Sequence, residues 1–181
     1  MKNEITGMKL RLIVMNFLQF AVWGAYLTSM GTYLFNIGLG AKIGLFYAMQ
    51  GIVSLFMPAI MGIIADRWVP AQKLYGFCHF MAAVFMEAAG WYGYVDGEAV
   101  NFGTLFTFYS LSVAFYMPTL ALTNSVAYTA LDKVKLDPVI AFPPIRIFGT
   151  IGFICSMLLT DILGFQNNYM QFFSCACFGV I

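Results

Sequence analysis

The feature that most constrains the fold of this chain is a series of long apolar runs with almost no charged residues inside them. A helix that spans a bilayer needs about 20 predominantly apolar residues. Six runs of this kind cover residues 10–35, 43–65, 74–94, 102–128, 138–163 and 169–181. The last run is cut short by the end of the sequence, so we expect the chain to be the front part of a longer protein.

Composition narrows the class of protein. Of the 181 residues, 61% are hydrophobic and only 9% are charged, whereas soluble proteins have about 25% charged residues. So few charges are not enough to cover the surface of a soluble domain. We therefore expect an all-α polytopic membrane protein with six transmembrane helices. The net charge of +1 excludes a generally basic surface for binding nucleic acid.

Residues with catalytic or metal-binding chemistry are sparse. Cys175 and Cys177 form a Cys-x-Cys pair, and a helix points two thiols with this spacing apart, which makes a poor metal site. His79 is interpreted as a packed histidine near one end of its helix rather than a proton relay. With no Ser/His/Asp arrangement and no phosphate-binding loop, we expect neither an enzyme nor a cofactor or metal.

The positions of lysine and arginine predict the orientation in the membrane. If the six runs all span the membrane, one side of it receives a single basic residue, Lys42, together with Asp96 and Glu98. The other side receives the amino terminus and the remaining basic residues of the connections. Because basic residues favour the cytoplasmic side, we expect the amino terminus to be cytoplasmic. The basic residues on that side are Lys2, Lys9, Arg11, Arg67, Lys73, Lys133 and Lys135.

Arg146 is the basic residue that lies inside an apolar run. A guanidinium in hydrocarbon is costly, so it is rarely found there without a partner or a ligand. Thr150 and Phe153 follow at i+4 and i+7, which puts all three side chains on one helical face. A charge, a hydroxyl and an aromatic ring in one stripe are suited to binding a polar solute that contains a ring.

The depth of Arg146 depends on where its helix begins. Asp137 is a good N-cap and Pro138 suits the first helical position. A start there places Arg146 roughly 12 Å into the helix, at about 1.5 Å per residue. In the alternative, the helix begins at Pro143 and Arg146 lies near the interface. We favour the deeper position.

The first apolar run carries a second polar stripe, which includes Asn16, Gln19, Trp23 and Tyr26. A polar face inside a membrane contacts either protein or an aqueous path. Asn16 is interpreted as a helix–helix hydrogen-bonding residue. For Gln19, Trp23 and Tyr26, packing and lining a substrate cavity are both open, since amide and aromatic groups suit a planar polar solute.

Glu87 is a carboxylate inside the third run. A desolvated carboxyl has a raised affinity for protons and is therefore a candidate for proton coupling. The alternative is a hydrogen-bonded structural acid, or one that reaches the interface. We favour the alternative.

The end of the second run resembles a family signature. Gly62, a small residue at 65 and then Asp66-Arg67 resemble the first half of the motif between the second and third helices of the major facilitator superfamily. The stretch 68–73 departs from the rest of that motif. The resemblance implies that Gly62, Asp66 and Arg67 form a conformational latch. The alternative is a simple cytoplasmic turn.

The fifth run narrows the resemblance. The stretch 142–153, FPPIRIFGTIGF, closely resembles a motif of the nucleoside:proton symporter family within that superfamily. The resemblance implies that Arg146, Thr150 and Phe153 bind nucleoside. Further agreement with the family comes from residues 16–20, Trp23-Gly24, 56–59, Cys78-His79 and 116–120.

The resemblance implies the amino-terminal half of a twelve-helix transporter that lacks its carboxy-terminal half here. Its partners would be a nucleoside, protons, the lipid bilayer of a bacterial inner membrane and the missing half, with no nucleic acid. The function implied is proton-coupled nucleoside uptake by alternating access. Two alternatives stay open: a carrier for sugars or other polyols, and a membrane nucleoside sensor or scaffold that does not transport.

Overall fold

A computed structural model describes residues 2–181, except for the side chains of Lys2, Asn3 and Glu98. Helices and connecting turns account for the whole described range, with short 3-10 turns at Gly40–Lys42, Gly97–Ala99 and Phe165–Asn167. The α-helices are α1 (Lys2–Gly24), α2 (Met30–Asn36), α3 (Ile43–Arg67), α4 (Ala71–Asp96), α5 (Phe102–Lys133), α6 (Pro138–Ile162) and α7 (Met170–Val180).

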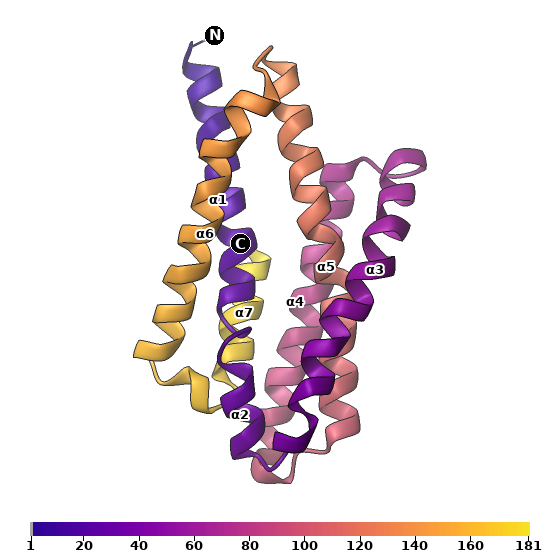
Figure 1. The fold of residues 1–181 in the computed structure, drawn as a ribbon, viewed down its shortest axis with the longest axis vertical. Helices are drawn as coiled ribbons and strands as arrows, with labels where there is room; N and C mark the ends of the chain where they lie inside the picture. Colours follow the sequence, from indigo (N-terminus) through magenta and orange to yellow (C-terminus); the bar gives the residue numbers. More distant parts are fainter. Residues whose placement is uncertain (1) are drawn as a thin grey trace.

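The helices form an elongated bundle with two sides (Figure 1). One side is made by α1 and α6, which contact each other along much of their lengths. The other side is made by α3, α4 and α5, with α5 packed against both of its neighbours. Helix α7 contacts α4 and α1 and so joins the two sides.

Four segments are long and apolar enough to cross a membrane: Glu4–Gly24, Gly40–Arg67, Phe102–Lys133 and Pro138–Ile162. Helix α4 is not among them, although its 26 residues give it a length of about 39 Å at 1.5 Å per residue. Helix α7 is apolar and has 11 residues. These helices confirm the expected all-α architecture of a polytopic membrane protein.

The single helix expected over residues 10–35 is two helices in the structure. Helix α1 ends at Gly24, and a turn leads into α2. Other helices supply partners for the carbonyl groups of this turn, as buried backbone at membrane depth requires. The hydroxyl of Thr160 donates to the Ala25 carbonyl at 3.1 Å, and the hydroxyl of Tyr47 donates to the Leu27 carbonyl at 2.7 Å.

Helices α1 and α6 approach each other backbone to backbone. A Cβ atom added at Gly24 would collide with the Phe153 carbonyl oxygen, and one added at Gly152 would collide with the Phe17 carbonyl oxygen. Small residues permit such close helix contacts in membranes. The two glycines therefore set how the Arg146 face of α6 lies against α1.

Aromatic side chains fill the centre of the bundle. Tyr26 lies edge-on to Tyr109 with ring centroids 6.1 Å apart, and Phe46 lies 5.0 Å from the same Tyr109 ring. Tyr33 lies edge-on to Phe172 at 5.4 Å. These contacts join the turn between α1 and α2 with α2, α3, α5 and α7 in one hydrophobic core.

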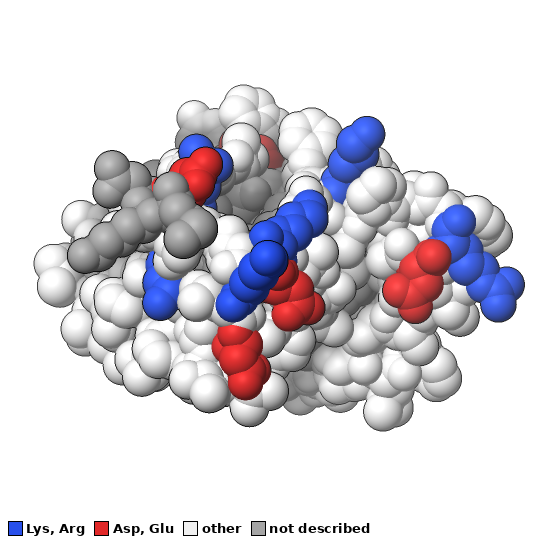
Figure 2. Space-filling model, turned by 90° about the horizontal axis from the view of Figure 1, so that it is seen from above, with Lys and Arg blue, Asp and Glu red and all other residues white. Residues whose placement is uncertain are grey.

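Charged side chains gather at one end of the bundle (Figure 2). This end holds the start of α1 and the α3–α4 and α5–α6 connections. Lys42 lies at the opposite end, in the turn before α3. The described basic residues that these segments contribute are Lys9, Arg11, Arg67, Lys73, Lys133 and Lys135.

Candidate functional site

The helix that carries Arg146 begins at Pro138, which is the deeper of the two alternatives drawn from the sequence. The side chain of Asp137 caps it by accepting a hydrogen bond from the backbone nitrogen of Val139 at 2.9 Å. Arg146 therefore lies in the third turn of α6, roughly 12 Å from its start at 1.5 Å per residue.

Helix α6 continues through Pro143 and Pro144. A proline removes the hydrogen bond to the carbonyl four residues earlier, which here frees the carbonyls of Val139 and Ile140. Both residues lie in the first turn and are 79% and 74% exposed. Water or lipid headgroups at the helix end are therefore available to satisfy the two freed carbonyls, and the helix tolerates both prolines.

The guanidinium of Arg146 lies over an aromatic ring from the neighbouring helix. Its Cζ atom is 3.9 Å from the ring centroid of Phe20 on α1, and the residue is half-buried. The described residues offer it no carboxylate within ion-pair distance. A contact of this kind contributes about 0.5–2 kcal/mol, so Phe20 offsets part of the cost of a guanidinium in a membrane helix.

Sequence reasoning did not single out Phe20 as a functional residue. Its position in α1 next to Gln19 gives no sign of a contact with α6. Only the close packing of α1 on α6 brings the ring under Arg146, and a Cβ added at Gly149 would lie 2.6 Å from the same ring.

Aromatic rings continue the site beyond Arg146. Trp23 lies edge-on to Phe153 with centroids 6.3 Å apart and an interplanar angle of 85°. Trp23 also lies 6.4 Å from Phe20 and 6.4 Å from Tyr116. The rings of Phe20, Trp23 and Phe153 thus form an aromatic wall, which we define by these three residues.

Thr150 and Phe153 accompany Arg146 on α6. Thr150 is exposed, and Phe153 is half-buried like Arg146. One face of α6 therefore presents a guanidinium with several N–H donors, a hydroxyl that both donates and accepts, and an aromatic ring. This set is able to hydrogen-bond to hydroxyl or carbonyl groups of a solute while a ring of the solute stacks.

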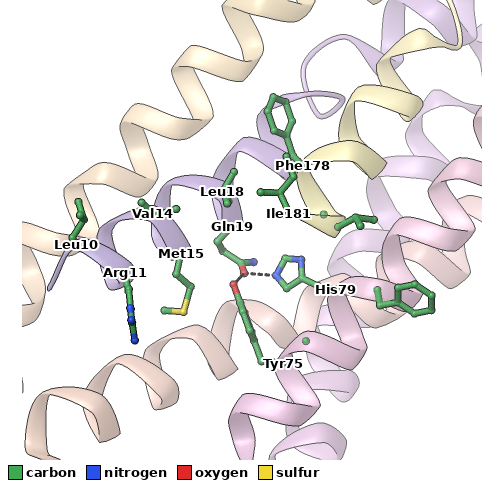
Figure 3. Close-up of a pocket in the computed structure, with 14 residues that line it drawn as sticks. Leu10, Arg11, Val14, Met15, Leu18, Gln19, Tyr75, His79, Phe178 and Ile181 are labelled. Carbon is green, nitrogen blue, oxygen red and sulfur yellow. Dashed lines mark hydrogen bonds between the residues drawn. The ribbon is translucent and has the colours of Figure 1, made fainter. Parts of the chain in front are cut away.

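Gln19 is the centre of a buried hydrogen-bond network. Its Oε1 accepts from the hydroxyls of Tyr75 at 2.8 Å and Thr123 at 3.0 Å, and its Nε2 donates to Thr119 at 2.8 Å. The same Oε1 lies 2.7 Å from Nε2 of His79, as Figure 3 shows. Because Oε1 only accepts, this histidine nitrogen carries the proton. Gln19 thus ties α1 to α4 and α5.

Tyr26 also lies inside the protein. It is 1% exposed and packs against Tyr109. Gln19 and Tyr26 are therefore both buried, whereas Arg146, Thr150 and Phe153 are half-buried or exposed.

A cavity of about 510 Å³ lies between α1, α4 and α7 (Figure 3). Its walls are mostly apolar, and Gln19, Tyr75 and His79 form its polar inner end. Arg146 does not line this cavity, which is separate from the aromatic wall. The lining residues are Leu10, Arg11, Val14, Met15, Leu18, Gln19, Tyr75, Gly76, His79, Phe80, Phe178, Gly179, Val180 and Ile181.

The remaining predicted residues lie elsewhere on the bundle. Glu87 is exposed on α4 and faces a groove shared with Phe173 and Cys177 of α7. Asp66 and Arg67 are exposed at the charged end of α3. A Cβ added at Gly62 would meet no other atom within 4 Å, so the described chain makes no close backbone contact there.

Comparison with known proteins places this geometry in context. A family model described as "Nucleoside H+ symporter" matches residues 6–181. The nucleoside permease NupG of Escherichia coli K12 is 38% identical over 178 residues, which is 97% of this chain and 41% of that protein. The xanthosine permease of the same strain is 39% identical over 166 residues, which is 91% of this chain and 38% of that protein.

The fold is similar to that of a solved transporter. The crystal structure of the nucleoside transporter NupG matches 95% of this chain and 41% of its own, with a TM-score of 0.86 and 38% identity. A mutant of the same transporter gives a TM-score of 0.88. The chain spans about two fifths of the length of the relatives it matches.

Proposed function

Since the chain belongs to the nucleoside H+ symporter family, we propose that the full protein carries nucleosides across a membrane together with protons. Its mechanism is alternating access, in which this bundle and a second one rock around a shared site. The present chain supplies one wall of that site.

The fold fits this role. The chain is a multi-pass membrane protein whose helices follow the arrangement of a major facilitator transporter. Its relatives are permeases and transporters, and it is therefore not an enzyme.

The observation that carries the proposal is the Arg146 face of α6. Phe153 stacks on the nucleobase, while Arg146 and Thr150 hydrogen-bond to ribose hydroxyls or base carbonyls. The half-buried or exposed state of all three residues supports this assignment, because each is accessible to a solute. A site built to pair with hydroxyl groups discriminates strongly against analogues that lack them.

Residues of α1 and of the turn that follows it contribute in a second layer. Trp23 offers a ring face beside Phe153. Gln19 and Tyr26 support the site indirectly, because their side chains are buried. Both polar atoms of the Gln19 amide hydrogen-bond to other side chains of the protein.

The orientation we propose has the amino terminus in the cytoplasm and the protein in a bacterial inner membrane. The gathering of lysine and arginine at the end that holds the start of α1 supports it (Figure 2), since basic residues favour the cytoplasmic side.

At the same end, we propose that Gly62, Asp66 and Arg67 act as a latch toward the second bundle. The exposure of Asp66 leaves its carboxylate free to meet a helix N-terminus of that bundle, where the helix dipole favours an anion. The open space around Gly62 leaves room for a helix of the second bundle to approach closely.

Glu87 is not the proton carrier in our proposal. Glu87 is exposed on α4 and is not among the residues around Arg146. We assign Glu87 a structural role, in which its carboxyl reaches a polar partner or the interface.

Uptake of radiolabelled uridine by the full-length protein in energised cells tests the function. We expect unlabelled nucleosides to compete, sugars to have no effect, and a protonophore to reduce accumulation. Competition by sugars would favour the carrier for sugars or polyols. Nucleoside binding without counterflow in proteoliposomes would instead favour a sensor.

A further inference from the structure

We propose that Gln50 of α3 is a positioning residue for the nucleoside site, because its side-chain amide holds the indole of Trp23 and so fixes the aromatic wall. This inference rests on the proposed function. Gln50 does not reach the site itself and acts through Trp23.

The amide of Gln50 connects two aromatic side chains from different helices. Trp23 Nε1 donates to Gln50 Oε1 at 3.0 Å, and Gln50 Nε2 donates to the hydroxyl oxygen of Tyr109 at 2.7 Å. Gln50 is 7% exposed. The chain Trp23–Gln50–Tyr109 therefore crosses the interior from α1 through α3 to α5.

Chemistry leaves one orientation for this amide. An indole N–H is only a donor, so the Gln50 atom that faces it must be the carbonyl oxygen. The amide nitrogen then points at Tyr109, whose hydroxyl oxygen accepts. With both ends of the amide engaged, rotation of the Gln50 side chain would break one buried and one partly buried hydrogen bond, each costly to lose.

The bond also settles what Trp23 offers to a solute. The indole N–H of Trp23 already donates to Gln50, so Trp23 presents only the carbon atoms of its ring to a solute. The same ring lies edge-on to Phe153 at 6.3 Å and next to Phe20 at 6.4 Å. The guanidinium of Arg146 in turn lies over Phe20, with its Cζ atom 3.9 Å from the ring centroid. The position of the indole therefore bears on both the stacking ring and the charged group of the site.

Without an acceptor from α3, the half-buried indole N–H would lose its partner. The ring would then turn toward water or toward the substrate, and the edge-on contact with Phe153 would change. A site loosened in this way binds substrate less tightly, whereas the rate of the conformational cycle is less affected. The expected signature is a rise in KM with a smaller change in Vmax.

Three variants of the full-length protein separate a positioning role from a general packing role. Q50L removes the acceptor. Q50E, in its protonated form, keeps a carbonyl oxygen for Trp23 and an O–H donor for Tyr109. S54A is the matched control, because Ser54 lies one turn along α3 and bonds only to the Gln50 backbone carbonyl, at 2.6 Å.

The readouts are the KM for labelled uridine and the 19F resonance of Trp23 in protein labelled with 5-fluorotryptophan, assigned with W23F. Q50L should raise KM roughly 2- to 13-fold, as loss of one hydrogen bond implies, and should move the Trp23 resonance. Q50E should restore both toward the wild-type values, and S54A should leave both unchanged. If Q50L does not accumulate in the membrane, Q50M replaces it.

An unchanged KM in Q50L would overturn the proposal, whether or not the resonance moves. A raised KM with an unmoved resonance would overturn it as well, because the effect would then bypass Trp23. Failure of the wild-type protein to take up either uridine or adenosine would contradict the proposed function instead. These results are therefore distinguishable.

Discussion

The guanidinium of Arg146 is held in a membrane helix by an aromatic face rather than by a carboxylate among the described residues. A ring attracts the charge without neutralising it. The N–H donors of Arg146 thus stay available for a neutral, hydroxyl-rich substrate. A paired carboxylate would compete with that substrate for the same donors.

Replacing Phe20 by leucine tests this arrangement. We expect the affinity for uridine to fall roughly 2- to 30-fold, which corresponds to loss of a cation–π contact of about 0.5–2 kcal/mol. Equilibrium binding to purified full-length protein measures the effect. The control is Phe80→Leu, at a position 56% exposed on α4. Equal losses in the two variants would argue against a specific role for Phe20.

Helical periodicity predicted that Arg146, Thr150 and Phe153 share one face, because all three lie within one helix. It did not predict Phe20 under Arg146 or the use of Gln50 by Trp23. Those contacts join different helices, and their sequence separations carry no periodic signal. Nor did periodicity reveal the hydrogen bonds of Gln19 to Tyr75 and Thr119, because these partners also lie on other helices.

Among the elements, the contact between α1 and α6 decides the geometry of the site. We expect Gly152→Ala to destabilise the full-length protein by about 1–3 kcal/mol through overpacking, because the new methyl group would meet the Phe17 backbone. Thermal unfolding in detergent measures this loss. Gly76→Ala, inside α4 where a Cβ would meet nothing within 4 Å, should be neutral or slightly stabilising. A neutral Gly152→Ala would show that the helices are farther apart.

The Gln19 network joins α1 to α4 and α5. Gln19→Leu would leave the half-buried Tyr75 hydroxyl and the buried His79 ring without their acceptor, at a cost of about 1–3 kcal/mol for an unsatisfied group. We expect a lower melting temperature for the full-length protein. Thr129→Val, at an exposed position of α5, is the control. Normal stability with impaired uridine binding would instead make Gln19 a substrate ligand.

The locations of the apolar runs along the chain could be read from the sequence, since long apolar segments leave few alternatives to a helix. The break between α1 and α2 could not. It depends on hydroxyl donors from Tyr47 and Thr160, which lie on other helices. A run of apolar residues does not reveal that distant side chains will replace its helical hydrogen bonds.

For the whole molecule, the proposed latch makes a kinetic prediction. Asp66→Ala should lower the Vmax of uridine transport roughly fivefold or more, in line with typical coupling free energies. The KM should change less, because Asp66 lies in the last turn of α3, whereas Arg146 lies on α6. Initial rates in proteoliposomes measure both constants.

Asp132→Ala, an exposed acid at the same end on α5, is the matched control for the latch. A wild-type Vmax in Asp66→Ala would leave the simple cytoplasmic turn as the better interpretation of Gly62, Asp66 and Arg67.

The central claim is that Arg146 of α6 faces a substrate path and binds nucleoside. Uridine uptake by full-length Arg146→Ala, normalised to the amount of protein in the membrane, tests it most directly. The account predicts that uptake is abolished while the protein still reaches the membrane and unfolds at a temperature close to wild type. Wild-type uptake by this variant would contradict the account.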